Sequence, residues 1–150
     1  MSIIDDAITR LRYHALATKY DATNTFKVAP EYPPESGGLA KPFCITYING
    51  GYMTQQDATT ARIFANLACD FHFDITRFKT AYSQINTFIP DFLKRLAGDP
   101  QLNSSVSTIS DNVTVEPPAQ TTWGNVGGTE LVTLMVRVIV PVKYMETPTS

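Results

Sequence analysis

The sequence has few charged residues and few of the residue types that most often bind metals or catalyse reactions. Asp, Glu, Lys and Arg make up only 17% of its 150 residues, and the formal net charge is −2. Basic residues are scattered or paired, as at Arg10 and Arg12, so no cluster would bind nucleic-acid phosphates. A charged fraction below the usual quarter indicates a surface of neutral polar residues, or a surface that a partner covers.

The chain also has only two cysteines and two histidines. Cys44 and Cys69 lie in apolar runs, where a reduced thiol behaves as a small buried hydrophobic group. A disulfide between them is the alternative if their two strands are neighbours. No CxxC pair or Cys/His cluster indicates zinc. The sequence has no signal-peptide segment at its N-terminus and no apolar run near the roughly twenty residues that span a bilayer. We therefore expect no cofactor or metal, no membrane partner, and folding in a reducing cytoplasm.

Apolar periodicity predicts two helices. Apolar residues recur at helical spacing over residues 2–18, where Ser2 is placed to cap the helix. A second, wider apolar stripe runs over residues 78–96 and ends at Gly98. Pro90 interrupts this second stripe, which predicts a kink or a break into two shorter helices.

Alternating and β-branched segments predict an antiparallel sheet. Its strands are expected at residues 43–48, 61–75 and 129–141, with short strands within 106–110 and 112–117. The strand at 43–48 should enter a turn at Asn49-Gly-Gly, and the run at 61–75 is long enough to bend or to project as one arm of a hairpin with its tip near 51–60. The order of elements predicts a single α+β domain over residues 1–150: an antiparallel β-sheet with an N-terminal helix and a long central helix packed on one face, and an extended hairpin and loops.

One segment, CDFHFDI at residues 69–75, is a candidate for catalysis or metal binding. In a strand, Asp70, His72 and Asp74 share one face, and two carboxylates with an imidazole suit a metal or an acid–base pair. Neighbours on one strand face are about 7 Å apart and the outer pair about 13 Å, so one metal would reach His72 and only one aspartate. The favoured alternative is that the three residues belong to the solvated polar face of a one-sided antiparallel sheet.

Large apolar residues also stand in segments that read as loops. Long loops are expected at residues 30–42 and 117–128, and residues 145–150 are expected to form a solvated or partner-bound tail. Exposed aromatic and Met side chains are enriched at protein interfaces, although such residues also fold back as lids on a core. The candidate interface residues are Tyr32, Pro33, Pro34 and Leu39 in the first loop, Tyr52 and Met53 at the hairpin tip, and Trp123 and Val126 in the second loop.

Four stretches follow one another in a recognisable order: the helix SIIDDAITRLRYHAL, the Pro-rich EYPPESGGLAKPF, the strand and helix of IFANLACDFHFDITRFKTAYSQINTFIPDFLKRL, and the closing WGNVGGTELVTLMVRVIV. In length and element order, most of the chain resembles a tail terminator, or tail completion, protein of a long-tailed bacteriophage. The resemblance implies a structural virion protein and not an enzyme, because the family has no catalytic residues to transfer.

The resemblance further implies a homo-oligomeric ring, usually a hexamer, that caps the tail tube, ends its polymerisation and gives the head its joining surface. Its partners would be the major tail tube protein and a head-completion or neck protein, with DNA passing through the channel without specific binding. The protein would belong to the tail and neck of the virion, after assembly in the host cytoplasm. In such a ring, Asp70, His72 and Asp74 would face the lumen or a subunit boundary. The alternatives are another neck or tail protein, such as a head-completion or tube subunit, and a small metal-dependent enzyme that uses these three residues.

Overall fold

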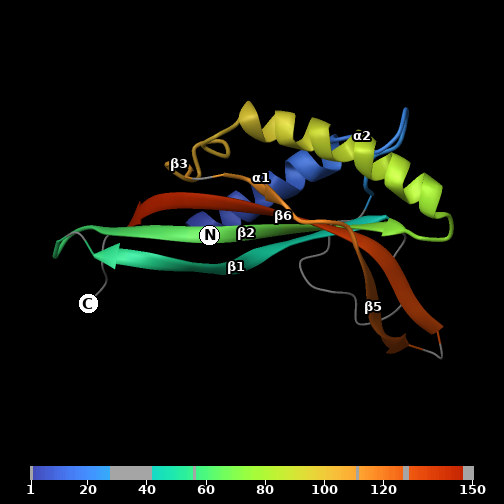
Figure 1. The fold of residues 1–150 in the computed structure, drawn as a ribbon. Coiled ribbons are helices and arrows are strands. Elements are labelled where there is room, and N and C mark those ends of the chain that lie inside the picture. Colours follow the sequence, from blue (N-terminus) through green and yellow to red (C-terminus); the bar gives the residue numbers. More distant parts are fainter. Residues whose placement is uncertain (1, 28–41, 56, 111, 127–128, 147–150) are drawn as a thin grey trace.

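The computed structural model describes residues 2–27, 42–55, 57–110, 112–126 and 129–146 (Figure 1). These residues form two helices and a six-stranded antiparallel sheet, and both helices lie on one face of the sheet. The predicted α+β fold is therefore confirmed.

Helix α1 (Ile3–Ala17) begins at the predicted cap. The Ser2 hydroxyl accepts a hydrogen bond from the Asp5 amide at 3.1 Å, and the Asp5 carboxylate accepts one from the Ser2 amide. This reciprocal pair is a capping box, which satisfies two amides that the helix itself leaves without partners. Ala7, Leu11 and Ala15 form the buried stripe of the helix and pack toward the sheet.

Helix α2 (Phe78–Ala97) is continuous through Pro90, so of the two predicted alternatives, a kink and a break into two helices, the break is wrong. Proline removes one amide donor, and the carbonyl that loses its partner belongs to Asn86, four residues earlier. Asn86 and Pro90 are both exposed, so water can bond that carbonyl. Phe88 and Phe92 are fully buried on either side of the proline and hold the helix on the sheet.

The sheet is built on three long strands, β1 (Phe43–Gln55), β2 (Ala61–Asp74) and β6 (Thr129–Glu146). Three shorter strands, β3 (Thr108–Ile109), β4 (Thr114–Val115) and β5 (Ala119–Val126), all pair with β6 on the side away from β2. Leu134 shows this arrangement, because it pairs with Phe73 of β2 and with Gln120 of β5. Three strand ends project beyond the helices: the end of β1 toward Gln55, the start of β2 at Ala61 and the end of β6 toward Glu146 (Figure 1). This projecting part of the sheet is called the arm.

Two glycines predicted to form a turn instead form a bulge within β1. The register between β1 and β2 shifts between Ile48 and Gly51, and pairing then continues to Gln55. Gly50 and Gly51 have φ angles of +94° and +153°, which residues with a side chain rarely adopt. A Cβ atom on Gly51 would lie 2.3 Å from the carbonyl oxygen of Phe64. The prediction that the strand ends at residue 48 is therefore wrong.

The prediction of a second loop at residues 117–128 is also wrong, because residues 119–126 form β5. This segment contains β-branched and aromatic residues, and the edge of β6 supplies the backbone partners that composition alone does not reveal. Strand β6 extends to Glu146, so two residues of the predicted tail pair with Ala61 and Arg62 of β2. Residues 147–150 and the predicted loop residues 30–41 lie outside the described part of the chain.

The core lies between the helices and the sheet and is centred on phenylalanines. The rings of Phe26 and Phe71 lie 4.9 Å and 4.5 Å from the ring of Phe88, and Phe73 and Phe92 complete the cluster. The opposite face of the sheet is buried as well along part of its length, where Phe43 and Ile45 are almost fully covered. The expectation of a sheet with one solvated face therefore fails in this region.

Candidate functional site

The structure uses Asp70 to join three strands on the sheet face opposite the helices. The Arg137 guanidinium of β6 donates from Nε to Asp70 Oδ1 at 2.8 Å and from Nη2 to Oδ2 at 3.1 Å. The Tyr47 hydroxyl of β1 donates to the same Oδ2 at 2.9 Å. Burial, followed by this hydrogen bond to a carboxylate, raises the pKa of Tyr47 to about 12. The hydrogen bond to Asp70 likewise raises the pKa of Arg137, so the guanidinium stays charged at neutral pH.

His72 is fully buried next to this ion pair. Its Nδ1 lies 2.7 Å from the Thr133 hydroxyl, and its ring stacks on Phe43 with centroids 4.7 Å apart. Burial lowers the pKa of His72 to about 4, because the charged imidazolium is poorly solvated there. The side chain is therefore neutral at physiological pH.

Asp74 lies apart from these two residues, at the exposed end of β2. Its carboxylate accepts hydrogen bonds from the Thr76 amide at 3.0 Å and the Thr76 hydroxyl at 2.7 Å, which closes the turn that leads to α2. The prediction that all three residues belong to a solvated face is wrong for Asp70 and His72. Asp70 is 5% exposed and neutralised by Arg137, whereas His72 is uncharged, so both can be buried. In the sequence, Arg137 is a charged residue within the alternating apolar run of β6. This position could have predicted an ion pair between Arg137 and Asp70.

The geometry offers no metal centre at this place. Within the described ranges, no group of three or more His, Cys, Asp or Glu side chains is placed to hold a metal ion. Both oxygens of Asp70 accept hydrogen bonds from Arg137 or Tyr47, and Nδ1 of His72 is bonded to Thr133. These hydrogen bonds join neighbouring strands and so stabilise the sheet. The polar atoms of Asp70 and Nδ1 of His72 bond to other protein groups and are not directed at a shared metal position.

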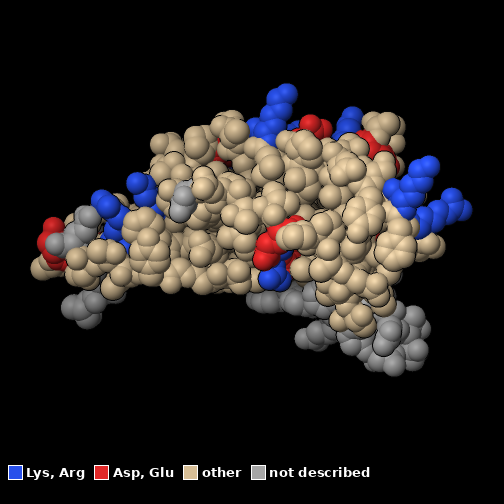
Figure 2. All heavy atoms as spheres, in the orientation of Figure 1, with Lys and Arg blue, Asp and Glu red and all other residues tan. Residues whose placement is uncertain are grey.

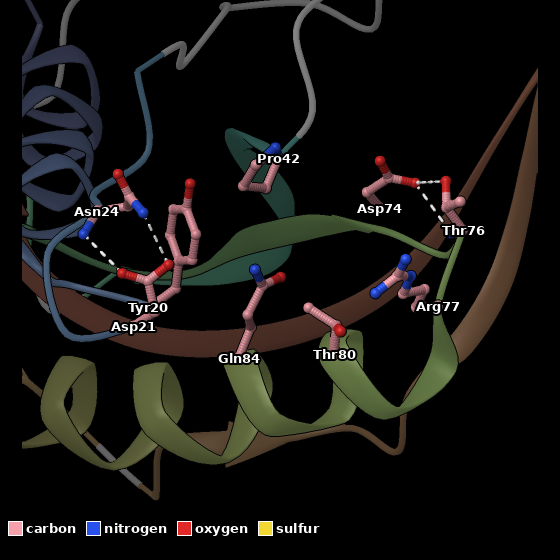
Figure 3. Close-up of a pocket in the computed structure, with 9 residues that line it drawn as sticks. All are labelled: Tyr20, Asp21, Asn24, Pro42, Asp74, Thr76, Arg77, Thr80 and Gln84. Atoms are coloured by element: carbon pink, nitrogen blue, oxygen red, sulfur yellow. Dashed lines mark hydrogen bonds between the residues drawn. The ribbon is translucent and has the colours of Figure 1, made fainter.

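A hollow of about 390 Å³ lies near the junction of β2 and α2 (Figure 3). Its carboxylates are used in local turns: Asp74 bonds Thr76, and Asp21 accepts hydrogen bonds from the amide and side chain of Asn24 at 2.7 Å and 2.8 Å. These bonds with Asn24, first among several, lower the pKa of Asp21. The hollow is lined by Tyr20, Asp21, Asn24, Pro42, Asp74, Thr76, Arg77, Thr80 and Gln84.

A second polar cluster, which the sequence reading missed, joins the two helices. Asp99, just after α2, accepts a hydrogen bond from Arg10 Nε at 2.7 Å, and its Oδ2 also lies 2.7 Å from His14 Nε2. Burial would raise the pKa of Asp99, but the hydrogen bonds from Arg10 and His14 outweigh it and lower the pKa to about 2. The cluster connects α1 to the end of α2, and its members are far apart in the sequence.

Exposed apolar side chains gather on the arm. Tyr52 is 65% exposed and Met53 is 58% exposed, which agrees with their predicted place at a surface. Ile48 and Met145 are also exposed there and were not predicted. Tyr52 stacks on Phe64 with ring centroids 4.6 Å apart, which holds the Tyr52 ring in place on one face of the sheet, whereas Met53 pairs with Ile63 on the other face.

The other predicted interface residues cannot be placed in the same way. Trp123 and Val126 lie on β5 and not in a loop, and nothing is described of their side chains. The remaining candidates lie outside the described residues; they are Tyr32, Pro33, Pro34 and Leu39.

The described residues thus define an α+β protein whose polar clusters are paired internally. Its exposed apolar residues include Tyr52, Met53 and Met145 on the projecting part of the sheet, and others lie on the two helices, among them Tyr13 and Tyr82. In comparisons with known proteins, no family model and no curated protein matches the chain. Neither helix of the described part is long and apolar enough to cross a membrane.

Proposed function

We propose that this chain is a structural assembly protein of a long-tailed bacteriophage. In this proposal it is a tail terminator, which forms a ring on the end of the tail tube, stops tube polymerisation and offers a joining surface to the neck. The observation that carries the proposal is the arm, where Ile48, Tyr52 and Met53 are exposed on a strand at the edge of the sheet. Exposed edge strands with apolar side chains are suited to binding another protein.

The internal pairing of the polar groups supports an assembly role over a catalytic one. The carboxylates of Asp70, Asp74, Asp21 and Asp99 each accept hydrogen bonds from neighbouring side chains or amides. Such bonds hold strands, turns and helices in place. A rigid framework with exposed apolar groups is what a subunit needs when it must fit its neighbours in a closed ring.

The charge distribution changes one part of the expected ring. Asp70 is neutralised by Arg137, so it adds no net negative charge to a channel wall, and His72 is buried within the subunit, so it does not line a channel. Asp74 is exposed and is the one of the three that we retain as a lumen or boundary residue. In this proposal, DNA passes through the ring without specific binding.

The test is native mass spectrometry of the purified chain over a range of concentrations, with and without a divalent transition metal, followed by negative-stain electron microscopy. A closed ring, with six subunits as the expected number and no stoichiometric metal, supports the proposal. Long stacked tubes would identify a tube subunit. A monomer with one tightly bound metal would refute the assembly role and favour a metal-dependent enzyme. A metal-free monomer that also fails to bind the ends of purified tail tubes would refute the proposal.

A further inference from the structure

The edge of β1 lacks the protection that natural sheet edges usually have. Strand β1 pairs with β2 along one side, and among the described residues no strand pairs with the other side of residues 44–55. Edge strands are normally protected by charged residues, prolines or short length. Strand β1 has 13 residues and contains neither a charged residue nor a proline. Residues 43–46 of β1 are buried, so the open part of this edge is residues 47–55, where the bulge at Gly50 and Gly51 is the one protective feature.

Strand β5 has the same character at the opposite edge of the sheet. Seven of its eight residues pair with β6 on one side, with a register shift between Trp123 and Asn125, and no other strand in the described ranges pairs with it. It also contains no charged residue and no proline. The described part of β5 before Trp123 is largely exposed, including Thr122.

The charges of the sheet lie on the inner strands. Strand β2 contains Arg62, Asp70 and Asp74, and β6 contains Arg137 and Lys143 in its inner part. Glu130 and Glu146 lie at the two ends of β6, where one neighbouring strand is paired in the described ranges. Globular sheets usually have the reverse distribution, because charges at the edges prevent pairing with other molecules. Figure 2 shows one face of the molecule, where charged side chains lie over the helix layer, toward the two ends and in one group near the middle, with uncharged surface between these groups.

We infer that β1 of one subunit pairs with β5 of the next copy of the chain, so that the sheet continues from subunit to subunit. The two free edges lie on opposite sides of one sheet, which makes the contact heterologous. A heterologous contact repeats from copy to copy and gives a ring where the rotation closes and an open filament where it does not. Pairing along β5 gives about one backbone hydrogen bond per residue pair, or roughly eight in all. The closure into a ring rests on the proposed function, whereas the pairing of edges rests on the two uncharged strands.

The first test places a lysine on each edge of the full-length chain. Met53→Lys on β1 and Thr122→Lys on β5 each put a charge at an exposed position, so the subunit should fold normally. Tyr82→Lys on α2 is the matched control, because Tyr82 is 45% exposed and lies in the helix layer. Each edge variant should raise the concentration of half-dissociation by at least about tenfold, since a desolvated charge at an interface is costly. The control should stay within about twofold of the original chain. Circular dichroism and thermal melting verify that all variants are folded.

The second test determines which edges meet. Cys44 and Cys69 are buried, so a cysteine introduced at Met53 or Thr122 is the accessible thiol for a short bismaleimide cross-linker. Each single variant should give no cross-linked species, and the double variant Met53→Cys, Thr122→Cys should give a ladder of covalent oligomers. Covalent dimers from Met53→Cys alone would show β1 paired with β1 and would overturn the inference.

The outcomes separate this inference from the proposed function. A ring that neither edge lysine weakens overturns the edge pairing and leaves the terminator proposal standing. Open-ended fibres that both edge lysines dissolve support the edge pairing and refute the closed ring. A chain that stays monomeric at every concentration, and forms no cross-links in the double variant, overturns the edge pairing.

Discussion

Lowering the pH should destabilise this protein through His72. The side chain is fully buried, stacked on Phe43 and bonded to Thr133, and its pKa falls from 6.5 to about 4. Burial is the main cause of the shift; Arg137 lowers the pKa further, whereas the nearby Asp70 carboxylate opposes the shift. Protonation in the folded state would place a second cation beside a guanidinium on a covered face of the sheet.

The sign and size follow from linkage between protonation and folding. Above pH 6.5 the imidazole is neutral in both the folded and the unfolded chain, so the full stability is present. Between about pH 6.5 and pH 4 the unfolded chain binds the proton and the folded chain does not, so stability falls as the pH falls. The shift corresponds to a loss of about 3 kcal/mol once the pH is below 4, of which about 2 kcal/mol is lost by about pH 5.

The measurement is urea unfolding at several values between about pH 7 and pH 5, a range that limits protonation of carboxylates with ordinary pKa values. The control is His72→Asn, which keeps a polar group near the position of Nδ1 but does not titrate. The variant should be less stable at every pH, and its stability should fall less steeply than that of the original chain, by about 2 kcal/mol over this range. Equal slopes for the two chains, or an NMR titration that gives His72 an ordinary pKa, would refute the reasoning.

Three further predictions concern stability. Asp70→Asn should lower the free energy of unfolding by about 2 kcal/mol, because it removes the charge that pairs with the arginine of β6; an unchanged urea midpoint would show that the ion pair contributes nothing. Phe88→Ala should cost about 3–5 kcal/mol, since the ring contacts the phenylalanine cluster, whereas Tyr82→Ala on the exposed side of α2 should cost below about 1 kcal/mol; similar costs would contradict the packing of α2. Gly51→Ala should lower the melting temperature more than Gly50→Ala, because a Cβ meets the carbonyl oxygen of β2 at position 51 and open space at position 50; the reverse order would argue against the bulge.

The proposed assembly connects these stability predictions to function. Asp70 and Phe88 hold the subunit together, so their variants should lower oligomer formation only as far as they unfold the subunit. The edge variants Met53→Lys and Thr122→Lys should lower oligomer formation without unfolding the subunit. The melting curve of the isolated subunit should therefore stay nearly unchanged. This contrast distinguishes residues that build the subunit from residues that join subunits.

Local periodicity was enough to predict most of the elements. The helical spacing of Ala7, Leu11 and Ala15 follows from the repeat of a single helix, and the alternation along residues 61–74 follows from the two-residue repeat of a strand. The Ser2 cap depends on contacts three residues apart. These features are determined within one turn or one strand, so the sequence alone predicts them. The exposure of Tyr52 and Met53 was predicted in the same way, from their place near the tip of a hairpin.

Other features depend on which segments meet in space. Residues 119–126 become a strand because β6 offers them a free edge, and the glycines at positions 50 and 51 become a bulge because β2 continues beside them. Asp70 is buried because a neighbouring strand places Arg137 directly opposite. Backbone hydrogen bonds and ion pairs between distant segments are not encoded in the local pattern. The sequence thus determined the periodic elements of this protein, and only the tertiary structure decided which charges are paired and which edges of the sheet remain open.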